Sequence, residues 1–403
     1  MILMEFDSER LEIVFGEGIT CSPPISLEPF NMVVLEFLSD LSGKISKDPE
    51  IKEFPDLAAF AFFIRKSNLL MLEKKHNIQE FRRGRGRVFH IAPSNVPLNF
   101  AYSLVFSLLA GNSNIVRLPS KDYYQVMAIC SAIRSVSQDP SYAKVSQMIG
   151  LVKYGHDEEI TKAISDRSSV RVVWGGDETI RKIREIPLPL ASLDIGFINK
   201  YSACVISAAK VLAVGQAGLE KLAANFYRDA YLFDQHGCSS PKIVIWCGND
   251  SEIRQAQEIF WNKVEANVRI DYDFQQIHAI DKFLDLCKLS VLEPAIVLSK
   301  NSNYLYRLEV PQSSILIGSY QGSNGVFLES SILSVLDLPG IISEIFQTLT
   351  YFGFEKHEFE PVITNLRNQG LDRIVPIGQA FSMETIWDGM DLIRTLSRVI
   401  DLR

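Results

Sequence analysis

Between residues 87 and 174 the chain alternates short apolar runs with stretches of helical periodicity, and this alternation limits the folds that it can adopt. The expected strands lie at 88–92, 114–118, 150–154 and 170–174, and the expected helices at 98–110, 122–136 and 158–166. Continuous apolar strands that alternate with helices are typical of a parallel sheet covered by helices on both faces. The sequence therefore predicts an α/β fold.

The flanking parts of the chain complete this picture. The first 80 residues have mainly helical spacing, and further strands are expected at 203–207, 243–246 and 313–318. A chain of 403 residues is long enough for two or three domains with separate cores. We expect a second α/β block to begin after residue 207.

One cysteine lies where a nucleophile could act. Cys238 ends a turn that contains Gly237 and comes shortly before the apolar run at 243–246. A thiol at such a turn faces a cleft and can have backbone N–H groups beside it, which suit a thiolate that attacks a carbonyl and the oxyanion that forms. The alternative is a small buried residue at the start of a core strand, because cysteine is among the most buried residue types. The segment alone leaves both interpretations open.

Three loops follow expected strands, and ligands of open parallel sheets bind at the carboxyl ends of the strands. In the first loop, Pro93 and Pro97 bracket Asn95. The carboxamide of Asn95 could donate to an oxyanion, although capping a helix or closing an Asx-turn is the commoner role of such an Asn. In the second loop, Arg117 and Lys121 could contact the ribose hydroxyls or 2′-phosphate of a dinucleotide, or Lys121 could be solvated at the start of a helix.

The third loop carries paired glycines. Gly175 and Gly176 would let the backbone approach a cofactor closely at the start of a helix, where phosphate is favoured. Asp177 and Glu178 would repel a phosphate there and could instead cap the helix. No expected strand is followed by the Gly-x-Gly-x-x-Gly pattern, so a Rossmann-type domain is inferred from the alternation alone.

Charge and cysteine spacing exclude several classes of protein. The net charge of −7 argues against a general nucleic-acid binder, and the arginine run at 82–87 could hold phosphate or form a solvated linker. The six cysteines form no Cys-x-x-Cys pair and no metal-ligand pattern, which predicts no metal site and indicates a reducing compartment. The N-terminus does not read as a signal peptide, and the longest apolar stretch, at 100–111, is too short to span a bilayer. We expect a cytoplasmic protein.

A set of short segments, taken in order, resembles the acyl-CoA reductases of the bioluminescence type, a branch of the aldehyde dehydrogenase superfamily. The resemblance extends from about residue 56 to near the C-terminus, and its specificity lies in the ordered set. The segments are His90–Pro97 (HIAPSNVP), Leu108–Asn112 (LLAGN), Val116–Ser120 (VRLPS), Val173–Asp177 (VWGGD), Asp234–Pro241 (DQHGCSSP), and Gly370–Gly378 (GLDRIVPIG) with Trp387–Gly389 (WDG).

The resemblance implies a fold and an assignment of roles. It implies a Rossmann-type cofactor domain with N-terminal helices at 1–207, a catalytic domain at 208–370, and a C-terminal segment at 371–403 that packs back on the body. Cys238 would be the acyl-accepting nucleophile, and Asn95 would lie at the oxyanion position. The expected cofactor-binding residues are Pro93, Ser94, Arg117, Ser120, Lys121, Gly175 and Gly176, with Arg117 in the place of the superfamily's usual ribose-binding lysine.

Two departures from the superfamily pattern refine the expected activity. The stretch 194–202 lacks a clear carboxylate base for hydrolysis, which suits a reductase because its acyl-enzyme must survive until hydride arrives. Ser120 and Lys121 stand where the superfamily has an acid that selects NAD, which favours NADPH, with NADH as the alternative. His236 could lower the pKa of Cys238 or only shape the turn.

The expected function is reduction of an acyl thioester, such as a fatty acyl-CoA or an acyl-protein, to an aldehyde through an acyl-cysteine. The alternatives are an acyl-phosphate reductase with the same cysteine chemistry and a non-catalytic subunit that binds an acyl-activating partner. The resemblance also implies a homo-oligomer that works beside an acyl-activating enzyme.

Overall fold

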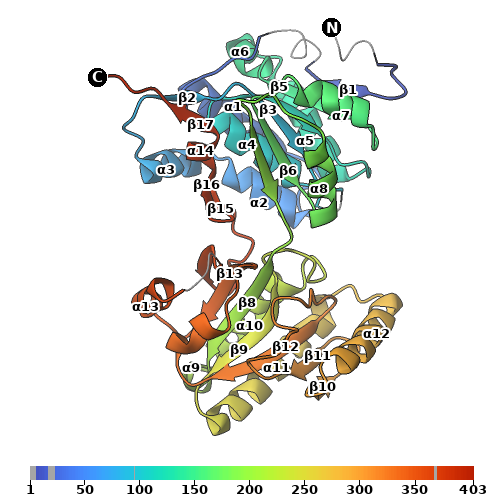
Figure 1. Cartoon of the computed structure of the whole chain (residues 1–403), viewed down its shortest axis with the longest axis vertical. Coiled ribbons are helices and arrows are strands. Elements are labelled where there is room, and N and C mark those ends of the chain that lie inside the picture. The colour runs from blue at the N-terminus through green and yellow to red at the C-terminus, as the bar shows by residue number, and fades with distance from the viewer. Residues whose placement is uncertain (1–5, 17–22, 95, 367–369) are drawn as a thin grey trace. The chain divides into compact units, whose positions relative to one another are not determined.

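The computed structural model describes residues 6–16, 23–94, 96–366 and 370–403, and it consists of two compact units. The first unit extends to Ile198 and also contains Met383–Arg403, and the second is Asn199–Ser382 (Figure 1). None of the described helices is long and apolar enough to cross a bilayer.

The first unit is built on a six-stranded sheet in the order β1-β5-β4-β3-β6-β7. Its strands are β1 (Glu12–Phe15), β3 (Arg87–Ile91), β4 (Ser113–Arg117), β5 (Ile149–Lys153), β6 (Val170–Trp174) and β7 (Leu193–Phe197). All neighbours are parallel except β1, which pairs antiparallel with β5 at the edge. The predicted α/β fold with a parallel sheet is confirmed, and the expected strands lie within one or two residues of the observed ones.

Helices connect the parallel strands and complete the first unit. They are α1 (Met32–Ile45), α2 (Pro55–Phe63), α3 (Lys66–His76), α4 (Asn99–Leu109), α5 (Tyr124–Val136), α6 (Ala143–Ser146), α7 (Glu158–Ser165), α8 (Asp177–Glu185) and α14 (Leu392–Thr395). The chain leaves α4 at Gly111, whose φ is +88° and where a Cβ would be 2.2 Å from the carbonyl oxygen of Leu27. Only glycine fits this turn into β4, because a side chain would meet both the strained φ and the backbone.

The arginine run is part of the fold and joins distant segments of the first unit. The strand β2 (Arg82–Gly84) pairs antiparallel with β17 (Ser397–Val399). Arg82 donates to the carbonyl of Arg394, at 2.7 Å, and Arg85 to that of Thr395, also at 2.7 Å. The expectations of a phosphate site or a solvated linker are therefore wrong for these two side chains, because their guanidinium groups bind the backbone of the C-terminal segment.

The second unit contains a seven-stranded sheet in the order β10-β11-β12-β9-β8-β13-β14. Its strands are β8 (Tyr201–Ser207), β9 (Pro241–Cys247), β10 (Val297–Asn301), β11 (Tyr306–Glu309), β12 (Val326–Ile332), β13 (Phe346–Phe352) and β14 (Arg373–Pro376). All pairs are parallel except β10 with β11. Because β8 lies inside this sheet, the change from one unit to the other comes before residue 201 and not after 207.

One expected strand of the second unit is absent. Residues 313–318 form consecutive turns, in which Ser314 N–H donates to Pro311 and Ile317 N–H to Ser314. Ser314, Leu316 and Gly318 are buried, whereas Ser313 and Ile315 are exposed. The apolar run at 315–317 that suggested a strand therefore lies in turns, and Gly318, with φ of +87°, ends the segment.

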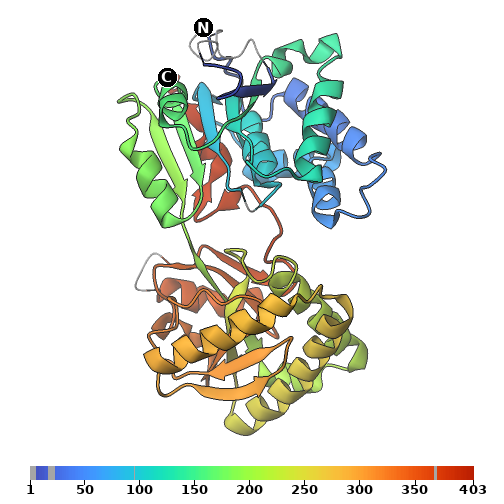
Figure 2. The same cartoon turned by 90° about the vertical axis from the view of Figure 1, so that its right-hand side faces the viewer.

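Helices cover both faces of the second sheet (Figures 1 and 2). Cys204 and Ile206 of β8 belong to an apolar cluster with α10 (Gln216–Ala230) and α11 (Asp250–Asp271). Ala203 and Val205, which alternate with them, belong to a second cluster that includes Leu289 of α12 (Gln276–Leu292). The short helices α9 (Ala208–Ala213) and α13 (Glu360–Thr364) complete the unit. The near-continuous burial of β8 and β9 follows from this coverage of both faces.

Candidate active site

Cys238 lies in a turn at the amino end of β9, in the centre of the second sheet. Residues 231–240 form this turn, and the side chain of Cys238 is half-buried and in no disulfide. The hydroxyl of Ser202, at the start of β8, donates to the Cys238 carbonyl at 2.6 Å. The adjacent Ser239 is buried and donates to Gln347 Oε1 of β13 at 3.0 Å. Backbone and neighbouring side chain are thus anchored to two strands, which fixes the position of the thiol.

Gln235 shapes the turn from inside. Its side chain is fully buried, donates to the carbonyls of Pro241 and Val326 at 2.9 and 3.0 Å, and accepts from Gly325 N–H at 3.1 Å. Asp234 and Gln235 both adopt left-handed backbone conformations, with φ of 51° and 63°. Such conformations are costly for residues other than glycine and persist where surrounding contacts hold them. The Gln235 contacts supply that constraint.

Lys242 follows the turn in the sequence, and its charged side chain is buried against it. Its side chain is buried, and Nζ donates to the carbonyls of Gln235 and of Gly322, the latter at 3.2 Å. Burial lowers the pKa of Lys242 to about 8, and the interaction with Cys238 partly opposes this shift. The contribution from Cys238 indicates that the ammonium lies within electrostatic reach of the thiol.

His236 is close to the same ammonium. Desolvation lowers the pKa of its ring, and the positive charge of Lys242 lowers it further. A lowered pKa keeps the imidazole neutral near neutral pH. The expectation that His236 provides a cation for Cys238 therefore has no support in its surroundings, and its backbone N–H instead closes the turn by donating to Phe233, at 2.7 Å.

The loop 378–382 packs against the turn that contains Cys238. Buried Asp229 accepts the backbone N–H groups of Gly378, at 2.6 Å, and Ala380, at 3.0 Å. The next residue, Phe381, packs its ring edge-to-face on Phe233 with centroids 4.9 Å apart. Burial raises the pKa of Asp229 to about 6 despite these two donors. Asp229 thus positions a loop that borders the cysteine turn.

In the first unit, two of the expected cofactor residues meet. The loops that follow β3 and β4 start side by side, since Ile91 pairs with Arg117 in parallel register. Ser94 and Ser120 are exposed and their hydroxyls lie 3.0 Å apart. Tyr123 donates to the Ser94 carbonyl at 2.9 Å. Pro93 is half-buried in the same loop, Lys121 is exposed in the second, and Asn95 lies outside the described residues.

Arg117 is largely engaged with the backbone. Its Nε and Nη2 donate to the carbonyls of Tyr154 and Gly155, at 3.3 and 2.7 Å, and its guanidinium lies 4.6 Å from the centre of the Tyr154 ring. These contacts use part of its five N–H donors and hold the loop after β5. Any contact with a ribose would have to use the remaining donors.

The paired glycines lie at the start of α8. Gly175 N–H donates to Phe197 at 3.4 Å, and Gly176 is the N-cap residue, whose carbonyl accepts from Ile180 N–H at 3.1 Å. Asp177 and Glu178 occupy the first turn of the helix, where carboxylates interact favourably with the helix dipole. Glu178 also pairs with Lys182, at 2.9 Å. Of the two interpretations of these acids, helix stabilisation fits their surroundings.

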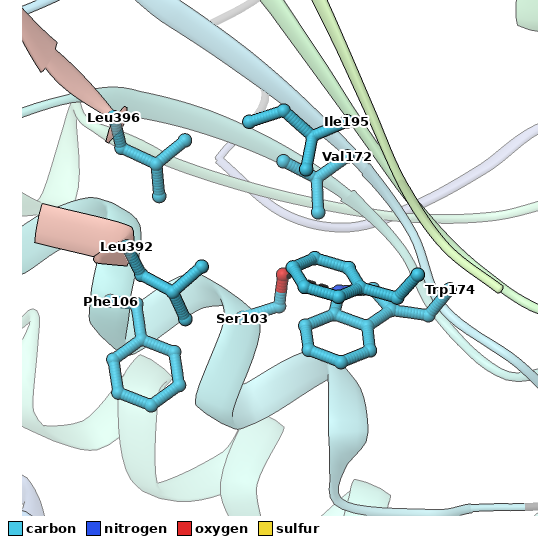
Figure 3. A pocket seen from close by; sticks show the side chains of 8 residues that line it. Ser103, Phe106, Val172, Trp174, Ile195, Leu392 and Leu396 are labelled. Atoms are coloured by element: carbon cyan, nitrogen blue, oxygen red, sulfur yellow. Dashed lines mark hydrogen bonds between the residues drawn. The ribbon is translucent and has the colours of Figure 1, made fainter. Parts of the chain in front are cut away.

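Residues of α4, β6, β7 and the C-terminal segment line a small cavity in the first unit (Figure 3). Its volume accessible to the centre of a water molecule is about 10 Å³, which is enough for about one water. Ser103 and Trp174 lie at its wall, and the indole Nε1–H donates to the Ser103 hydroxyl at 3.0 Å. The cavity is thus too small for a substrate and belongs to the core.

The Ser103 hydroxyl connects Trp174 to a fully buried histidine. Ser103 Oγ lies 2.7 Å from His90 Nδ1, and His90 Nε2 lies 3.0 Å from Asn114 Oδ1. Neutral His90 satisfies both contacts when Nδ1 accepts from the hydroxyl and Nε2–H donates to the amide. Burial lowers the pKa of His90 to about 4, which is consistent with this neutral form. His90 is therefore a structural residue within the first of the segments that carried the resemblance.

Sequence reasoning did not identify Lys242 or Asp229 as residues of the site. Lys242 is four positions after Cys238, at the start of β9, where a charge would ordinarily face solvent. One signal was available in the sequence: Lys242 is the only charged residue of the apolar strand β9, and a lysine that is buried in such a strand needs a partner. Asp229 offers no such signal, because it ends a helix and looks like an exposed helix residue.

The chain matches a family model described as "Acyl-CoA reductase (LuxC)" over residues 66–270, slightly more than half of its length. It is similar to a long-chain acyl-protein thioester reductase of Photorhabdus laumondii, with 27% identity over 170 residues that cover 42% of this chain and 33% of the relative. A Photobacterium phosphoreum protein of the same description is 23% identical over 78% of this chain and 62% of its own length. The matched parts thus span between about a third and three fifths of these relatives.

Solved structures share the fold at low identity. A glyceraldehyde-3-phosphate dehydrogenase of Methanocaldococcus jannaschii, complexed with NADP, aligns with a TM-score of 0.63 and 13% identity, covering 92% of this chain and 88% of its own. A betaine aldehyde dehydrogenase of Staphylococcus aureus, in complex with NAD⁺, aligns with a TM-score of 0.60 and 11% identity, covering 85% and 74%. The chain therefore has the aldehyde dehydrogenase fold, and the resemblance on which the sequence-based expectations depended is confirmed.

Proposed function

The chain belongs to the acyl-CoA reductase (LuxC) family, and from this premise we propose that it reduces an acyl thioester to an aldehyde through an acyl-cysteine on Cys238. The observation that supports the proposal is the turn at the start of β9. There the backbone of the half-buried Cys238 is held by Ser202, and the buried Lys242 ammonium interacts electrostatically with the cysteine. A fixed thiol near a buried cation suits nucleophilic attack, because the thiolate is the reactive form.

In the first half of the reaction, the Cys238 thiolate attacks the thioester carbonyl carbon. The C–S bond to the enzyme forms, and the carbonyl oxygen takes the negative charge. We assign Asn95 and the backbone N–H of Cys238 to that oxyanion, and donors of this kind each contribute on the order of 10² to 10³ in rate. The bond to the donor's sulfur then breaks and the donor leaves as a thiol, taking a proton from water. The acyl group remains on Cys238.

NADPH, when bound, supplies the hydride that reduces the acyl-cysteine to a thiohemiacetal. The thiohemiacetal collapses when its oxygen reforms the carbonyl and the Cys238–carbon bond breaks, which releases the aldehyde and restores the thiolate. No step requires a metal ion. The thiolate returned at the end is the nucleophile of the next cycle.

We assign the cofactor to the loops after β3, β4 and β6 of the first unit. The exposed hydroxyls of Ser94 and Ser120 and the exposed ammonium of Lys121 are groups that bind ribose oxygens and a 2′-phosphate. Pro93, Gly175 and Gly176 would supply close backbone approach, and Arg117 its remaining N–H donors. Lys121 is the reason for preferring NADPH over NADH.

Further parts of the proposal concern the setting of the reaction. The donor is an acyl-CoA or an acyl-protein, and a separate enzyme activates the acyl group. The protein acts in the cytoplasm as a homo-oligomer. These assignments rest on the family and on the expectations from sequence, and size-exclusion chromatography with light scattering measures the oligomeric state.

The test measures NADPH and NADH oxidation with acyl-CoAs of increasing chain length, together with the intact mass of the protein after incubation without cofactor. We expect oxidation and a single acyl adduct in the wild type, and neither in Cys238→Ala. Cys247→Ala is the matched control, because Cys247 ends β9, the strand that follows the turn of Cys238, and is also half-buried. An adduct that persists in Cys238→Ala would contradict the assignment. Turnover only with acyl phosphates would favour the acyl-phosphate reductase.

A further inference from the structure

Lys242 is a buried charge whose hydrogen-bond partners are neutral. Its side chain is 2% exposed, and Nζ donates only to backbone carbonyls in the contacts described, those of Gln235 and Gly322. Other lysines of the described chain, such as Lys200 and Lys263, form ion pairs with carboxylates, and none of the described ion pairs includes Lys242. A buried ammonium is costly unless an opposite charge compensates it.

The contacts of the ammonium place its charge at the turn that contains Cys238, because Nζ donates to the carbonyl of Gln235, three residues before the cysteine. Burial lowers the pKa of Lys242 to about 8, and the interaction that opposes this shift comes from Cys238. Electrostatic coupling is reciprocal, so a thiolate that favours the ammonium is itself favoured by it. A lysine that is buried at this point therefore has an electrostatic partner only when the thiol is ionised.

The other titratable groups around the turn do not supply a positive charge that could stabilise the Cys238 thiolate. Desolvation and Lys242 lower the pKa of His236, which keeps its ring neutral. Asp234 accepts a hydrogen bond from Tyr272, at 2.7 Å, and carries a charge of the wrong sign. On α12, burial lowers the pKa of Lys282 and the charge of Asp281 opposes that shift, and His278 lies 3.3 Å from the Tyr272 hydroxyl. From the 320–325 segment and β8 come the neutral phenols of Tyr320 and Tyr201, whose pKa values burial raises.

The backbone around Lys242 keeps the two groups in place. The carbonyl of Gln235 that receives the ammonium belongs to the cysteine turn, and that of Gly322 belongs to the segment before β12. Asn324 N–H donates to Asp234 at 2.9 Å, so the turn and this segment are also joined by a backbone bond. Little reorganisation is needed when the thiolate forms, which is the condition for effective electrostatic stabilisation.

We propose that Lys242 is a positioning residue that holds Cys238 in the thiolate form from inside the protein. The ammonium keeps its proton throughout, and it acts through the sulfur without touching the substrate. Its part in acyl transfer rests on the proposed function, whereas its effect on the thiol does not. When the acyl group is attached and the sulfur loses its charge, the ammonium is left uncompensated, which favours release of the product and return of the thiolate.

The test is the rate at which iodoacetamide alkylates Cys238 as a function of pH, followed by peptide mass spectrometry on the full chain. This readout needs neither acyl donor nor cofactor, so it separates failure of the inference from failure of the proposed reductase activity. In the wild type we expect the alkylation midpoint to lie below that of an ordinary thiol, about 8.5. A wild-type midpoint at or above that value would overturn the inference without any variant.

Substitutions then assign the effect to Lys242. Lys242→Met should raise the midpoint by about one unit or more and slow alkylation at pH 7 about tenfold, whereas Lys242→Arg should keep most of the wild-type rate. Lys282→Met is the matched control. Lys282 is also buried, has a pKa lowered to about 8, and donates to the 320–325 segment, through the Asn324 carbonyl at 3.0 Å. If both methionine variants fold, as judged by circular dichroism, and shift the midpoint equally, Lys242 has no specific role.

Discussion

Gly237, the residue before Cys238, lies directly against the ring of Phe381: a Cβ at position 237 would be 2.5 Å from a ring carbon. This contact joins the cysteine turn to the loop 378–382, which Asp229 holds by two backbone N–H groups. The ring of Phe381 cannot move freely, because it also packs on Phe233. The absence of a side chain at 237 is therefore a condition for the position of the thiol.

Gly237→Ala should displace either the turn or the ring. Overpacking of this kind costs about 1–3 kcal/mol in unfolding free energy, and we expect Cys238 alkylation to change with it. Phe381→Leu in the same chain should relieve the clash. The measurement is a double-mutant cycle of urea unfolding and alkylation rate. Additive effects of the two substitutions would show that the contact does not position the turn.

Asp229 should be essential for the order of the neighbouring loop. Asp229→Ala leaves the N–H groups of Gly378 and Ala380 without their acceptor, at a cost of about 1–3 kcal/mol for the buried donor of Ala380 and less for the half-buried donor of Gly378. Asp229→Asn keeps one acceptor oxygen and should lose about half as much. Urea unfolding gives the free energies, and hydrogen exchange at Gly378 and Ala380 should accelerate in both variants. Unchanged protection at these two amides would contradict the assigned role.

His90 should make the first unit sensitive to acid. Its pKa falls from 6.5 to about 4 on folding, so the unfolded chain binds more protons between these values. Stability from this group is complete above pH 6.5 and is lost as pH falls, by about 3 kcal/mol at pH 4. Unfolding free energies measured across this range should show a shallower slope in His90→Gln, whose stability at pH 7 will be lower. An equal slope in both proteins would mean that His90 is already charged in the fold.

Lys121 should discriminate between the two nicotinamide cofactors. If its exposed ammonium meets a 2′-phosphate, Lys121→Ala will weaken NADPH binding about tenfold, which corresponds to about 1.4 kcal/mol, and will leave NADH binding nearly unchanged. Fluorescence titration of the bound cofactor gives both dissociation constants. Lys162→Ala is the control, because Lys162 is an exposed lysine of α7. Equal losses for NADPH and NADH would place the ammonium elsewhere on the cofactor.

The parallel sheets and the cysteine turn could be predicted from local patterns. Apolar runs such as Val170–Trp174 are buried on both faces, so their composition alone marks them as central strands. Gly111 after α4 is marked by the backbone freedom that its turn needs, whereas Gly237 before Cys238 leaves room for the ring of Phe381. The strand expected at 313–318 was wrong, because its apolar residues lie in consecutive turns that end at Gly318, whose φ is +87°.

The sequence by itself thus determined the class of fold, the positions of most strands along the chain and the place of the thiol, because these depend on periodicity and on turn chemistry within a few residues. Only the tertiary structure decided what surrounds that thiol. Burial and charge pairing depend on segments far apart in the chain, such as Gly322 beneath Lys242 and Phe381 against Gly237. The same holds for Arg82, whose positive charge looked available for phosphate until the C-terminal segment supplied its partners. Side-chain type is local, but electrostatic environment is a property of the packed molecule.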